Sequence, residues 1–402
     1  MRLLFSALAL CAAVLSQAAG KDFPLVEARE VTPRGGLPNF FRKAQTTGAE
    51  IKIGYLGGSI TAQNGWRVQT LAHFRQACPQ ASFTEINAAI GGTGSDLGVF
   101  RVQQDVLSKG PDLLFVEFAV NDGGADPQRI IRAMEGIVRQ TWKANPGTDI
   151  CFVYTITEAL SPPMLEGKLQ RSASAMEKVA DHYGIPSITL GMEVAKLAKA
   201  GKLLWRAKLP KTADERAALA DRFVFAPDST HPHESTGHVL YTQAIVRSLP
   251  ALAIANATPT PHVIGPALDA ANWERAKLVP ITGAKLSAGL ASADPATDAH
   301  AKVWAKRLPV MVKLTRPGQS LEFRFQGTHC AVYDVVGPAG GKVAVTLDGG
   351  KPFVVQRIDA YGTYPRLSTF IVGTDLPEGV HSVRLELLAD PIDKAAVLAK
   401  NK

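Results

Sequence analysis

Short apolar runs alternate with amphipathic stretches between residues 51 and 249. The apolar runs have the length and the β-branched and aromatic content of strands, and they cover residues 51–56, 82–87, 112–118, 149–155 and 186–190. The stretches between them have the apolar spacing of helices, and they cover residues 65–76, 96–107, 127–143 and 165–182. Strands that are apolar almost throughout and separated by helices predict a parallel sheet covered on both faces.

The predicted fold of residues 21–255 is therefore α/β, a flavodoxin-like, three-layer α/β/α domain. Residues 233–249 have the pattern of a closing helix. Residues 21–50 are rich in Pro and Gly, so we expect them to wrap the surface before the core begins. Residues 197–222 are less regular and rich in Lys, Arg and Ala, which predicts helical pieces at the surface or at the rim of a cleft.

The pattern changes after about residue 278 to short runs of β composition separated by turn residues. These runs cover residues 310–314, 320–325, 330–336, 342–347, 353–358, 368–372 and 381–387. They predict an all-β accessory domain, a β-sandwich or jelly roll, over residues 279–390. We expect the Pro-containing residues 256–278 to form a linker and residues 391–402 to form a frayed tail.

Residues 1–20 have the pattern of a secretory signal peptide, with a charged start, an apolar core over residues 3–15 and small residues at possible cleavage sites. The apolar core is too short to span a bilayer, and no other stretch approaches the roughly 18 apolar residues that a spanning helix needs. We therefore expect a secreted or periplasmic protein. A lipid anchor on Cys11 is a minor alternative, because Leu10 stands where a small residue is needed.

The composition narrows the possible partners. The net charge is +8, but Lys and Arg are scattered, and no basic stripe interleaved with aromatic residues predicts a nucleic-acid site. No Cys and His cluster has zinc-ligand spacing and no phosphate-binding loop occurs, so no metal or other cofactor is implied.

The mature chain keeps Cys78, Cys151 and Cys330; a bridge between the first two is possible, but three buried thiols fit the wide spacing better. The oligomeric state stays open.

Polar residues gather where the predicted strands end. Ser59 follows the first strand after a Gly-Gly pair, residues 87–94 (NAAIGGTG) follow the second, and Asn121 follows the third. Asp228 and His231 precede the closing helix. Since the carboxyl ends of parallel strands meet at one edge of the sheet, we expect these groups to lie around one cleft. Taken alone, Ser59 could be a turn serine that caps the next helix.

These side chains are the parts that acyl transfer needs. A serine hydroxyl becomes a nucleophile when a base takes its proton, and a histidine can take it and later protonate the leaving alcohol. An aspartate on the other imidazole nitrogen fixes the tautomer. Glycine backbone N–H groups and an asparagine side chain can stabilise the oxyanion of the tetrahedral intermediate.

The segments around Ser59, residues 87–94, Asn121 and the Asp228–His231 pair resemble the four sequence blocks of the SGNH, or GDSL-type, hydrolases. The resemblance covers roughly residues 51–249, with the blocks in the family's order, and departs from the usual Gly-Asp-Ser-Leu by a glycine at position 58. It implies Ser59 as nucleophile, His231 as base and Asp228 as the third member of the triad. It also implies an oxyanion hole formed by Ser59, Gly92 and Asn121.

Alternatives remain at several of these positions. His233 and His238 compete with His231, although the Asp-x-x-His spacing favours His231; Asp228 could merely cap a turn. Gly91 and Gly94 stand close enough to be confused with Gly92, and Asn121 could be a local turn former.

Two further groups of residues are candidates for contact with a ligand. Trp66 and Arg67 follow the nucleophile and are candidate substrate contacts, with packing of Trp66 in its helix as the alternative. Tyr361 and Tyr364 could line a sugar site or cap the β core, of which packing is the commoner outcome.

The resemblance implies a metal-independent serine esterase. Together with the signal peptide and the β domain, it favours a secreted carbohydrate acetylesterase that removes O-acetyl groups from a polymer, and the use of the β domain in this argument is analogy. A lipase-like or thioesterase-like hydrolase of small acyl esters, an acyltransferase with the same residues, and a glycan-binding protein with an inactive hydrolase domain are the alternatives. The sequence leaves open which sugar and which ester position would be used.

Overall fold

The computed structural model describes residues 23–253 and 260–400. Contacts divide the chain into two compact units, Met1–Lys277 and Leu278–Lys402. The predicted signal peptide, residues 1–20, lies outside the described residues. Within the described ranges, no helix has both the length and the apolar character that crossing a bilayer requires.

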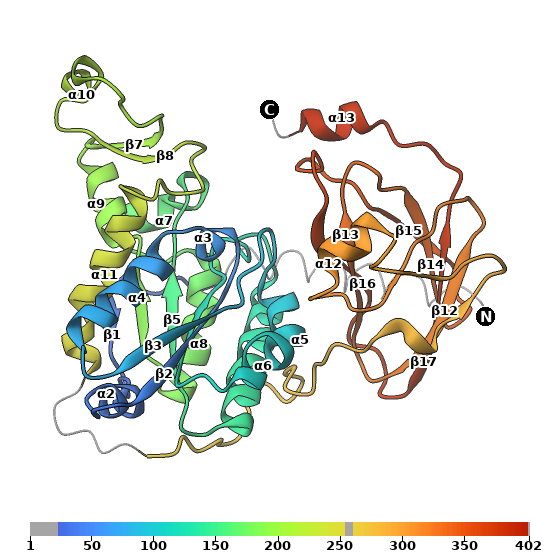
Figure 1. The fold of residues 1–402 in the computed structure, drawn as a ribbon, viewed down its shortest axis with the longest axis horizontal. Coiled ribbons are helices and arrows are strands. Elements are labelled where there is room, and N and C mark those ends of the chain that lie inside the picture. The colour runs from blue at the N-terminus through green and yellow to red at the C-terminus, as the bar shows by residue number, and fades with distance from the viewer. Residues whose placement is uncertain (1–22, 254–259, 401–402) are drawn as a thin grey trace, which may run out of the picture. The chain divides into compact units, whose positions relative to one another are not determined.

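A six-stranded sheet forms the centre of the first unit (Figure 1). Its strands lie in the order β1-β6-β5-β4-β2-β3, and every neighbouring pair is parallel except β1 with β6. The strands are β1 (Val31–Thr32), β2 (Glu50–Gly57), β3 (Ser82–Asn87), β4 (Leu113–Glu117), β5 (Asp149–Tyr154) and β6 (Ser187–Thr189). The five parallel strands lie where the sequence predicts them, and β3 begins and ends at the predicted residues.

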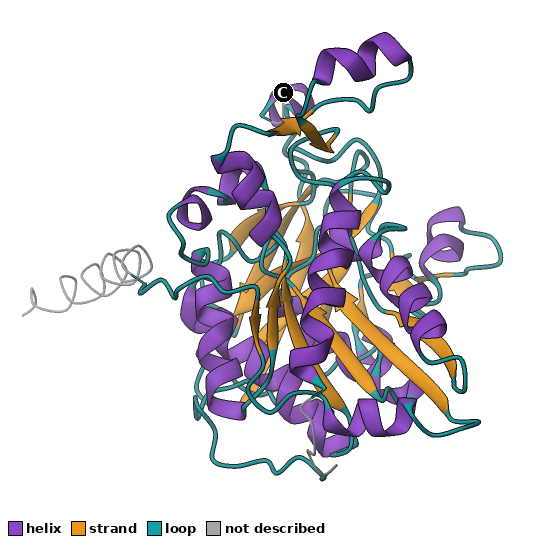
Figure 2. Cartoon of the chain, turned by 90° about the vertical axis from the view of Figure 1, so that its left-hand side faces the viewer, coloured by secondary structure: helices purple, strands orange, loops and turns teal. Residues whose placement is uncertain are grey.

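Helices cover both faces of this sheet, as Figure 2 shows edge-on. Successive side chains of β4 alternate between two hydrophobic clusters: Leu113 and Phe115 join one, and Leu114 and Val116 join the other. The first cluster is completed by α2 (Pro38–Ala44), α4 (Trp66–Ala77), α9 (Met192–Lys199) and α11 (Gly237–Leu252). The second is completed by α5 (Ser95–Asp105), α6 (Pro127–Ala144) and α8 (Arg171–Tyr183). The prediction of an α/β core with three layers is therefore confirmed.

The segment before the core does more than wrap the surface. Within it, β1 extends the sheet as an antiparallel edge strand, and Phe40 of α2 and Leu37 just before this helix lie in the core with no more than 1% of their surface exposed. Pro at the first position of α2 fixes a backbone angle that suits a helix start. The expectation of a surface wrap was wrong because Phe40 and its neighbours supply apolar surface that Pro and Gly content conceals.

Residues 203–226 form a projecting arm in the upper left of Figure 1. The arm consists of β7 (Leu203–Arg206), α10 (Ala213–Leu219) and β8 (Phe223–Ala226), with β7 parallel to β8. Helix α10 buries none of its residues and begins with a capping box between Thr212 and Glu215. The predicted helical piece is present, but the strand pair was missed because each strand is only four residues long.

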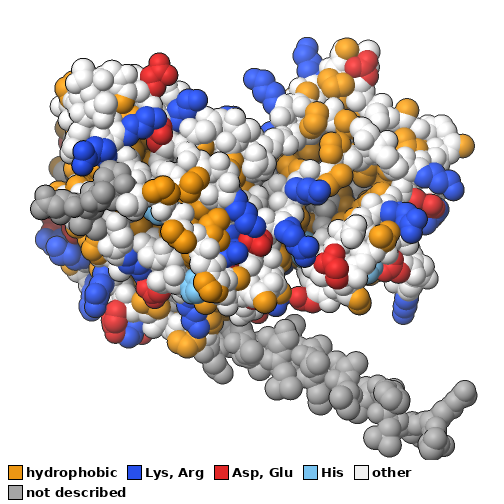
Figure 3. Space-filling model, turned by 90° about the horizontal axis from the view of Figure 1, so that it is seen from below, with side chains coloured by type: hydrophobic (Ala, Val, Ile, Leu, Met, Phe, Trp, Pro, Cys, Tyr) orange, Lys and Arg blue, Asp and Glu red, His pale blue; other side chains and the backbone are white. Residues whose placement is uncertain are grey.

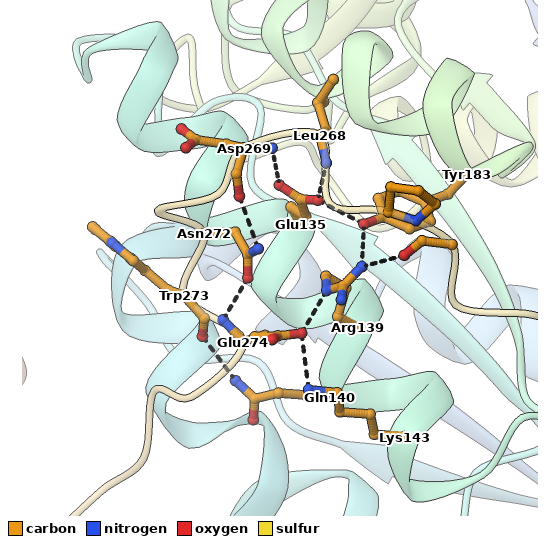
Figure 4. A network of polar contacts seen from close by, with 12 residues as sticks. Glu135, Arg139, Gln140, Lys143, Tyr183, Leu268, Asp269, Asn272, Trp273 and Glu274 are labelled. Atoms are coloured by element: carbon orange, nitrogen blue, oxygen red, sulfur yellow. Dashed lines mark hydrogen bonds and ion pairs between the residues drawn. The ribbon is translucent and has the colours of Figure 1, made fainter.

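Residues 260–277, predicted as part of a linker, pack against helix α6 (Figure 4). Trp273 and Ile264 join the second cluster, and the N–H of Trp273 donates to the carbonyl of Arg132. Glu274 pairs with Arg139 at 2.5 Å and with Lys143 at 2.9 Å. The segment therefore belongs to the α/β unit, and the boundary between the units falls after Lys277.

The second unit is an antiparallel β structure, which confirms the predicted all-β region. A five-stranded sheet has the order β15-β14-β17-β12-β9, and β13 pairs with β16 and β10 with β11. The strands are β9 (Lys285–Leu286), β10 (Ser292–Ala293), β11 (Met311–Val312), β12 (Ser320–Gln326), β13 (Cys330–Val336), β14 (Lys342–Leu347), β15 (Phe353–Gln356), β16 (Arg366–Gly373) and β17 (Val380–Leu387). One cluster contains Leu385 of β17, Phe370 of β16 and Cys330 of β13, so the larger sheet and the β13–β16 pair share a core.

Two expectations for this unit need revision. Tyr361 and Tyr364 are each about 60% exposed, so they do not cap the core. The predicted tail contains a short helix, α13 (Lys394–Ala399), and another short helix, α12 (Ala299–Trp304), precedes β11. On the face seen in Figure 3, Lys and Arg side chains lie among Asp, Glu and apolar side chains rather than in a continuous stripe.

The cysteines of the described residues are free thiols. Cys151 lies in β5 and Cys330 in β13, both buried, and Cys78 is half-buried. Burial raises the pKa of the Cys330 thiol to about 12. The bridge that the sequence left possible between Cys78 and Cys151 is absent, and the thiols behave as small apolar side chains.

Candidate active site

Ser59 lies where β2 leaves the sheet. Strand β2 ends at Gly57, and Ser59 is the first residue of a single helical turn, α3 (Ser59–Ala62). No side chain caps this turn. The Ser59 Oγ lies instead 2.8 Å from Nε2 of His231, a residue 172 positions later in the chain. The alternative of a capping serine is therefore not what the structure shows.

Asp228 serves both the backbone and the imidazole of His231. Its Oδ1 accepts the N–H of His231 at 2.8 Å and that of Thr230 at 3.0 Å, which closes the turn after β8. Its Oδ2 lies 2.7 Å from Nδ1 of His231. Partial burial opposes ionisation, but these hydrogen bonds outweigh it and hold the pKa of Asp228 below its usual range. The carboxylate can therefore fix a tautomer with Nδ1 protonated and Nε2 free to accept from Ser59.

The two competing histidines have other contacts. His238 is fully buried in α11; its Nδ1 accepts the N–H of Trp66 at 3.2 Å, and its Nε2 faces Gln63. Burial lowers the pKa of His238 to about 4, so the ring stays neutral at neutral pH. His233 donates to the carbonyl of Ala207 at 2.9 Å and ties the loop that carries Asp228 and His231 to the arm. Neither ring contacts Ser59 in the described structure, and His231 is the histidine that does.

The expected oxyanion residues Gly92 and Asn121 lie next to residues that border Ser59: Gly92 follows Gly91, which lies beside the Ser59 side chain, and Asn121 lies against Gly58. Gly92 has a left-handed backbone with φ of 71°, a conformation that favours glycine. Asn121 lies against Gly58, where a Cβ atom would overlap its side-chain oxygen. Among the described residues, neither the Asn121 amide nor the N–H groups of Ser59 and Gly92 have a hydrogen-bond acceptor. These groups are therefore available to a ligand.

The contact at Gly58 gives a physical reason for the departure from the usual Gly-Asp-Ser-Leu. The space that a side chain at position 58 would occupy is filled by Asn121. Of the two glycines that compete with Gly92, Gly94 lies against Asp122 and Gly91 lies beside the Ser59 side chain.

Trp66 and Arg67 do not line the site as the sequence suggested. Trp66 is fully buried, with its ring edge-on to Tyr55 at 5.4 Å. Arg67 is 3% exposed, donates to the carbonyl of Thr61 at 3.1 Å and pairs with Glu85. Both residues belong to the framework beneath α3. The prediction of substrate contact was wrong for them because the first turn of α4 points these two side chains toward the sheet.

Three buried ionisable residues beneath the site were not singled out from the sequence. Arg101 of α5 donates to the carbonyls of Ala88 and Gly57, which joins the loops after β2 and β3. Asp122 accepts the N–H of Ser95 at 3.0 Å at the start of α5. Glu117 ends β4 and accepts from two threonine hydroxyls. For Glu117, the signal available in the sequence was a charged residue at the end of an otherwise apolar strand.

The arrangement suits the hydrolysis of an ester. The His231 side chain is 37% exposed and that of Asp228 is 48% exposed, so the dyad faces solvent beside Ser59. Among the described residues, no three His, Cys, Asp or Glu side chains gather as metal ligands would. A hydroxyl with a base at 2.8 Å, an oriented base and free N–H donors are the requirements of acyl transfer.

Comparison with known proteins finds a family model that matches part of the chain and solved structures that share its fold. Residues 55–236 match the model of the GDSL-like Lipase/Acylhydrolase family. No curated protein matches the chain in sequence. A crystal structure of a two-domain esterase active on acetylated mannans matches with 20% identity and a TM-score of 0.72, over 91% of this chain and 95% of that one. The same enzyme co-crystallized with mannopentaose matches with 20% identity and a TM-score of 0.70, over the same shares. These matches cover both units.

Proposed function

We propose that this chain, a carboxylic ester hydrolase, removes acetyl groups from a carbohydrate polymer. Its residues 55–236 form a domain of the GDSL-like lipase/acylhydrolase family. The observation that carries the proposal is the hydrogen-bonded line from Ser59 through His231 to Asp228. The likeness of both units to an esterase active on acetylated mannans supports the choice of substrate class.

The proposed reaction passes through an acyl-enzyme. The Ser59 Oγ attacks the acetyl carbonyl carbon while Nε2 of His231 takes the hydroxyl proton, and Asp228 stabilises the imidazolium that forms. The N–H groups of Ser59 and Gly92 and the Asn121 amide bind the oxyanion. The bond from the carbonyl carbon to the sugar oxygen then breaks, and His231 gives the proton to that oxygen. Water repeats the sequence on the acetyl-serine, releasing acetate and restoring Ser59.

A substrate panel tests the proposal. Acid release should be measured for the intact protein on acetylated mannan, acetylated xylan, a small aryl acetate and a long-chain aryl ester. We expect acid release from at least one acetylated glycan and from the aryl acetate, and much slower release from the long-chain ester. The reason is that the arm beside the site is charged and its helix α10 presents no buried apolar face. Faster release from the long-chain ester than from any glycan would contradict the proposal and favour a lipase-like hydrolase.

The export of the protein is a separate proposal. Its support is the signal-like sequence of residues 1–20, which fits a polymer substrate met outside the cell. Expression of the full chain in a bacterial host, followed by N-terminal sequencing of the periplasmic or culture fraction, should give a mature chain that starts near residue 21. Recovery of the uncleaved chain from the cytoplasm alone would contradict export.

A further inference from the structure

A carboxyl group lies buried directly beneath the turn that carries Ser59. Glu117 is the last residue of β4 and is 1% exposed. Its Oε2 accepts the hydroxyl of Thr61 at 2.8 Å, and its Oε1 accepts the hydroxyl of Thr155 at 2.6 Å. The backbone N–H of Gly58 also faces this carboxyl group and acts to lower its pKa. Glu117 is therefore tied to two separate parts of the chain, the turn that carries Ser59 and the residue that follows β5.

Two of these contacts come from residues that flank Ser59 in the sequence. Gly58 immediately precedes Ser59, and Thr61 follows it within the same helical turn. The fit is tight, because a Cβ atom at Gly57 would lie 2.7 Å from the Thr61 Oγ1 and 2.8 Å from the carbonyl oxygen of Glu117. Thr155, which follows β5, anchors the opposite oxygen of the carboxyl group to the sheet. The turn thus has little freedom to move relative to β4.

Burial of this carboxyl group carries a cost that apolar packing would avoid. Desolvation raises the pKa of Glu117, and the hydrogen bonds from Thr155, Thr61 and Gly58 only partly oppose it. Those donors are hydroxyl and N–H groups, and no Lys, Arg or His of the described residues forms an ion pair with Glu117. A buried polar group that is fully hydrogen-bonded fixes geometry more strictly than apolar contacts do.

We propose that Glu117 is a positioning residue for the nucleophile: its carboxyl group holds Gly58 and Thr61, and through them directs the Ser59 hydroxyl toward His231 and the Ser59 N–H toward the oxyanion. The inference rests on the proposed function of Ser59. It adds a residue that contacts neither substrate nor base. A displacement of about 1 Å in a reacting group can lower the rate by about a hundredfold.

Glu135 provides a matched control for a purely structural carboxyl group. It is fully buried in α6 and accepts from the Tyr183 hydroxyl at 2.6 Å, the Leu268 N–H at 2.6 Å and the Asp269 N–H at 2.9 Å (Figure 4). It therefore resembles Glu117 in burial and in accepting hydrogen bonds at both carboxyl oxygens. It holds residues 268–269 and no part of the site.

The experiment compares Glu117→Gln, Glu117→Ala and Glu135→Gln with the parent full-length protein. Aryl acetate hydrolysis gives kcat and KM, a fluorophosphonate probe gives the labelling rate of Ser59, and thermal unfolding gives Tm. We expect Glu117→Ala to lower kcat and the labelling rate by about a hundredfold, with KM within about threefold of the parent value. Glu135→Gln should lower Tm while leaving kcat and the labelling rate at parent values.

Thr61 gives a second test should the Glu117 variants not fold. Thr61→Val removes one hydrogen bond to Glu117, and Thr61→Ser keeps the hydroxyl, so turnover should fall in the first and recover in the second. Parent-like kcat in Glu117→Ala or Thr61→Val, or an equal loss of kcat in Glu135→Gln, would overturn the positioning role. Failure of the proposed function looks different: parent protein that neither hydrolyses the ester nor reacts with the probe at Ser59.

Discussion

At the scale of single residues, Asp228 shows why two interpretations of one side chain need not compete. The sequence offers Asp228 either as a turn cap or as the third member of a triad. The structure gives one oxygen to each task, with Oδ1 on the loop N–H groups and Oδ2 on the imidazole. Between them, Ser229 has a left-handed backbone with φ of 68°, a strained conformation for a serine. The short Asp-x-x-His spacing therefore lets one carboxylate bond both to the backbone of the loop and to the imidazole.

Replacement of Asp228 by Asn should separate the two tasks. Asn keeps an oxygen for the Thr230 and His231 N–H groups, so Tm should stay near that of the parent. Its amide would donate to Nδ1 and favour the tautomer that cannot accept from Ser59, and kcat should fall by about 10⁴-fold. Asp228→Ala, which also loses the loop contacts, should lower Tm as well. Parent-like turnover of Asp228→Asn would contradict the proposed role of the carboxylate.

Asp122 should make stability depend on pH in the unusual direction for a carboxyl group. Burial raises its pKa to about 7, so the native state holds a proton that the unfolded chain releases near pH 4. The free energy of unfolding therefore falls as the pH rises from about 4 to about 7. Asp122→Asn cannot ionise, and its stability relative to the parent should improve by up to about 4 kcal/mol over that range. Urea unfolding at both pH values measures the change; a constant difference would contradict the raised pKa.

At the scale of elements, the sequence predicted the parallel strands well because their apolar runs are bounded by Gly, Pro and charged residues. The sequence did not predict which side chains of a helix point toward the core. Trp66 and Arg67 follow the nucleophile in sequence, yet α4 turns both toward the core. It also failed for residues 260–277, where prolines suggested a linker but Trp273 and Glu274 hold the segment on α6. Such contacts depend on tertiary packing, which local pattern does not contain.

The packing of residues 260–277 can be tested at Gly136. A Cβ atom there would lie 2.7 Å from the backbone of Trp273 and 2.7 Å from Val99. Gly136→Ala should therefore cost about 1–3 kcal/mol of stability by overpacking and increase protease cleavage within 260–277. Gly265→Ala in the same segment meets open space and is the matched control. Cleavage of Gly136→Ala at the rate of the control would show that the segment does not depend on this contact.

At the scale of the whole molecule, the proposed catalytic residues and their supports all belong to the first unit. Ser59, His231, Asp228 and Glu117 precede Lys277, and the second unit has a separate hydrophobic cluster. The position of the site at the carboxyl edge of the sheet followed from the topology alone. The role of the second unit did not follow, because a β fold can serve many functions.

A chain that ends at Lys277 should therefore keep its activity on small esters. The core of the first unit remains complete, and we expect kcat/KM for an aryl acetate within about threefold of the full-length value. A division of labour in which the second unit helps to bind the polymer predicts that activity on an acetylated glycan polymer falls more than activity on the aryl ester. An equal loss on both substrates would contradict a division of labour between the units.

Covalent labelling of Ser59 tests the central claim most directly. A fluorophosphonate probe should attach once per chain, on the peptide that contains Ser59, and acetate release should disappear in proportion to labelling. Ser59→Ala should resist the probe and lose turnover by about a millionfold. Labelling at another residue, or turnover by Ser59→Ala equal to that of the parent, would contradict the account.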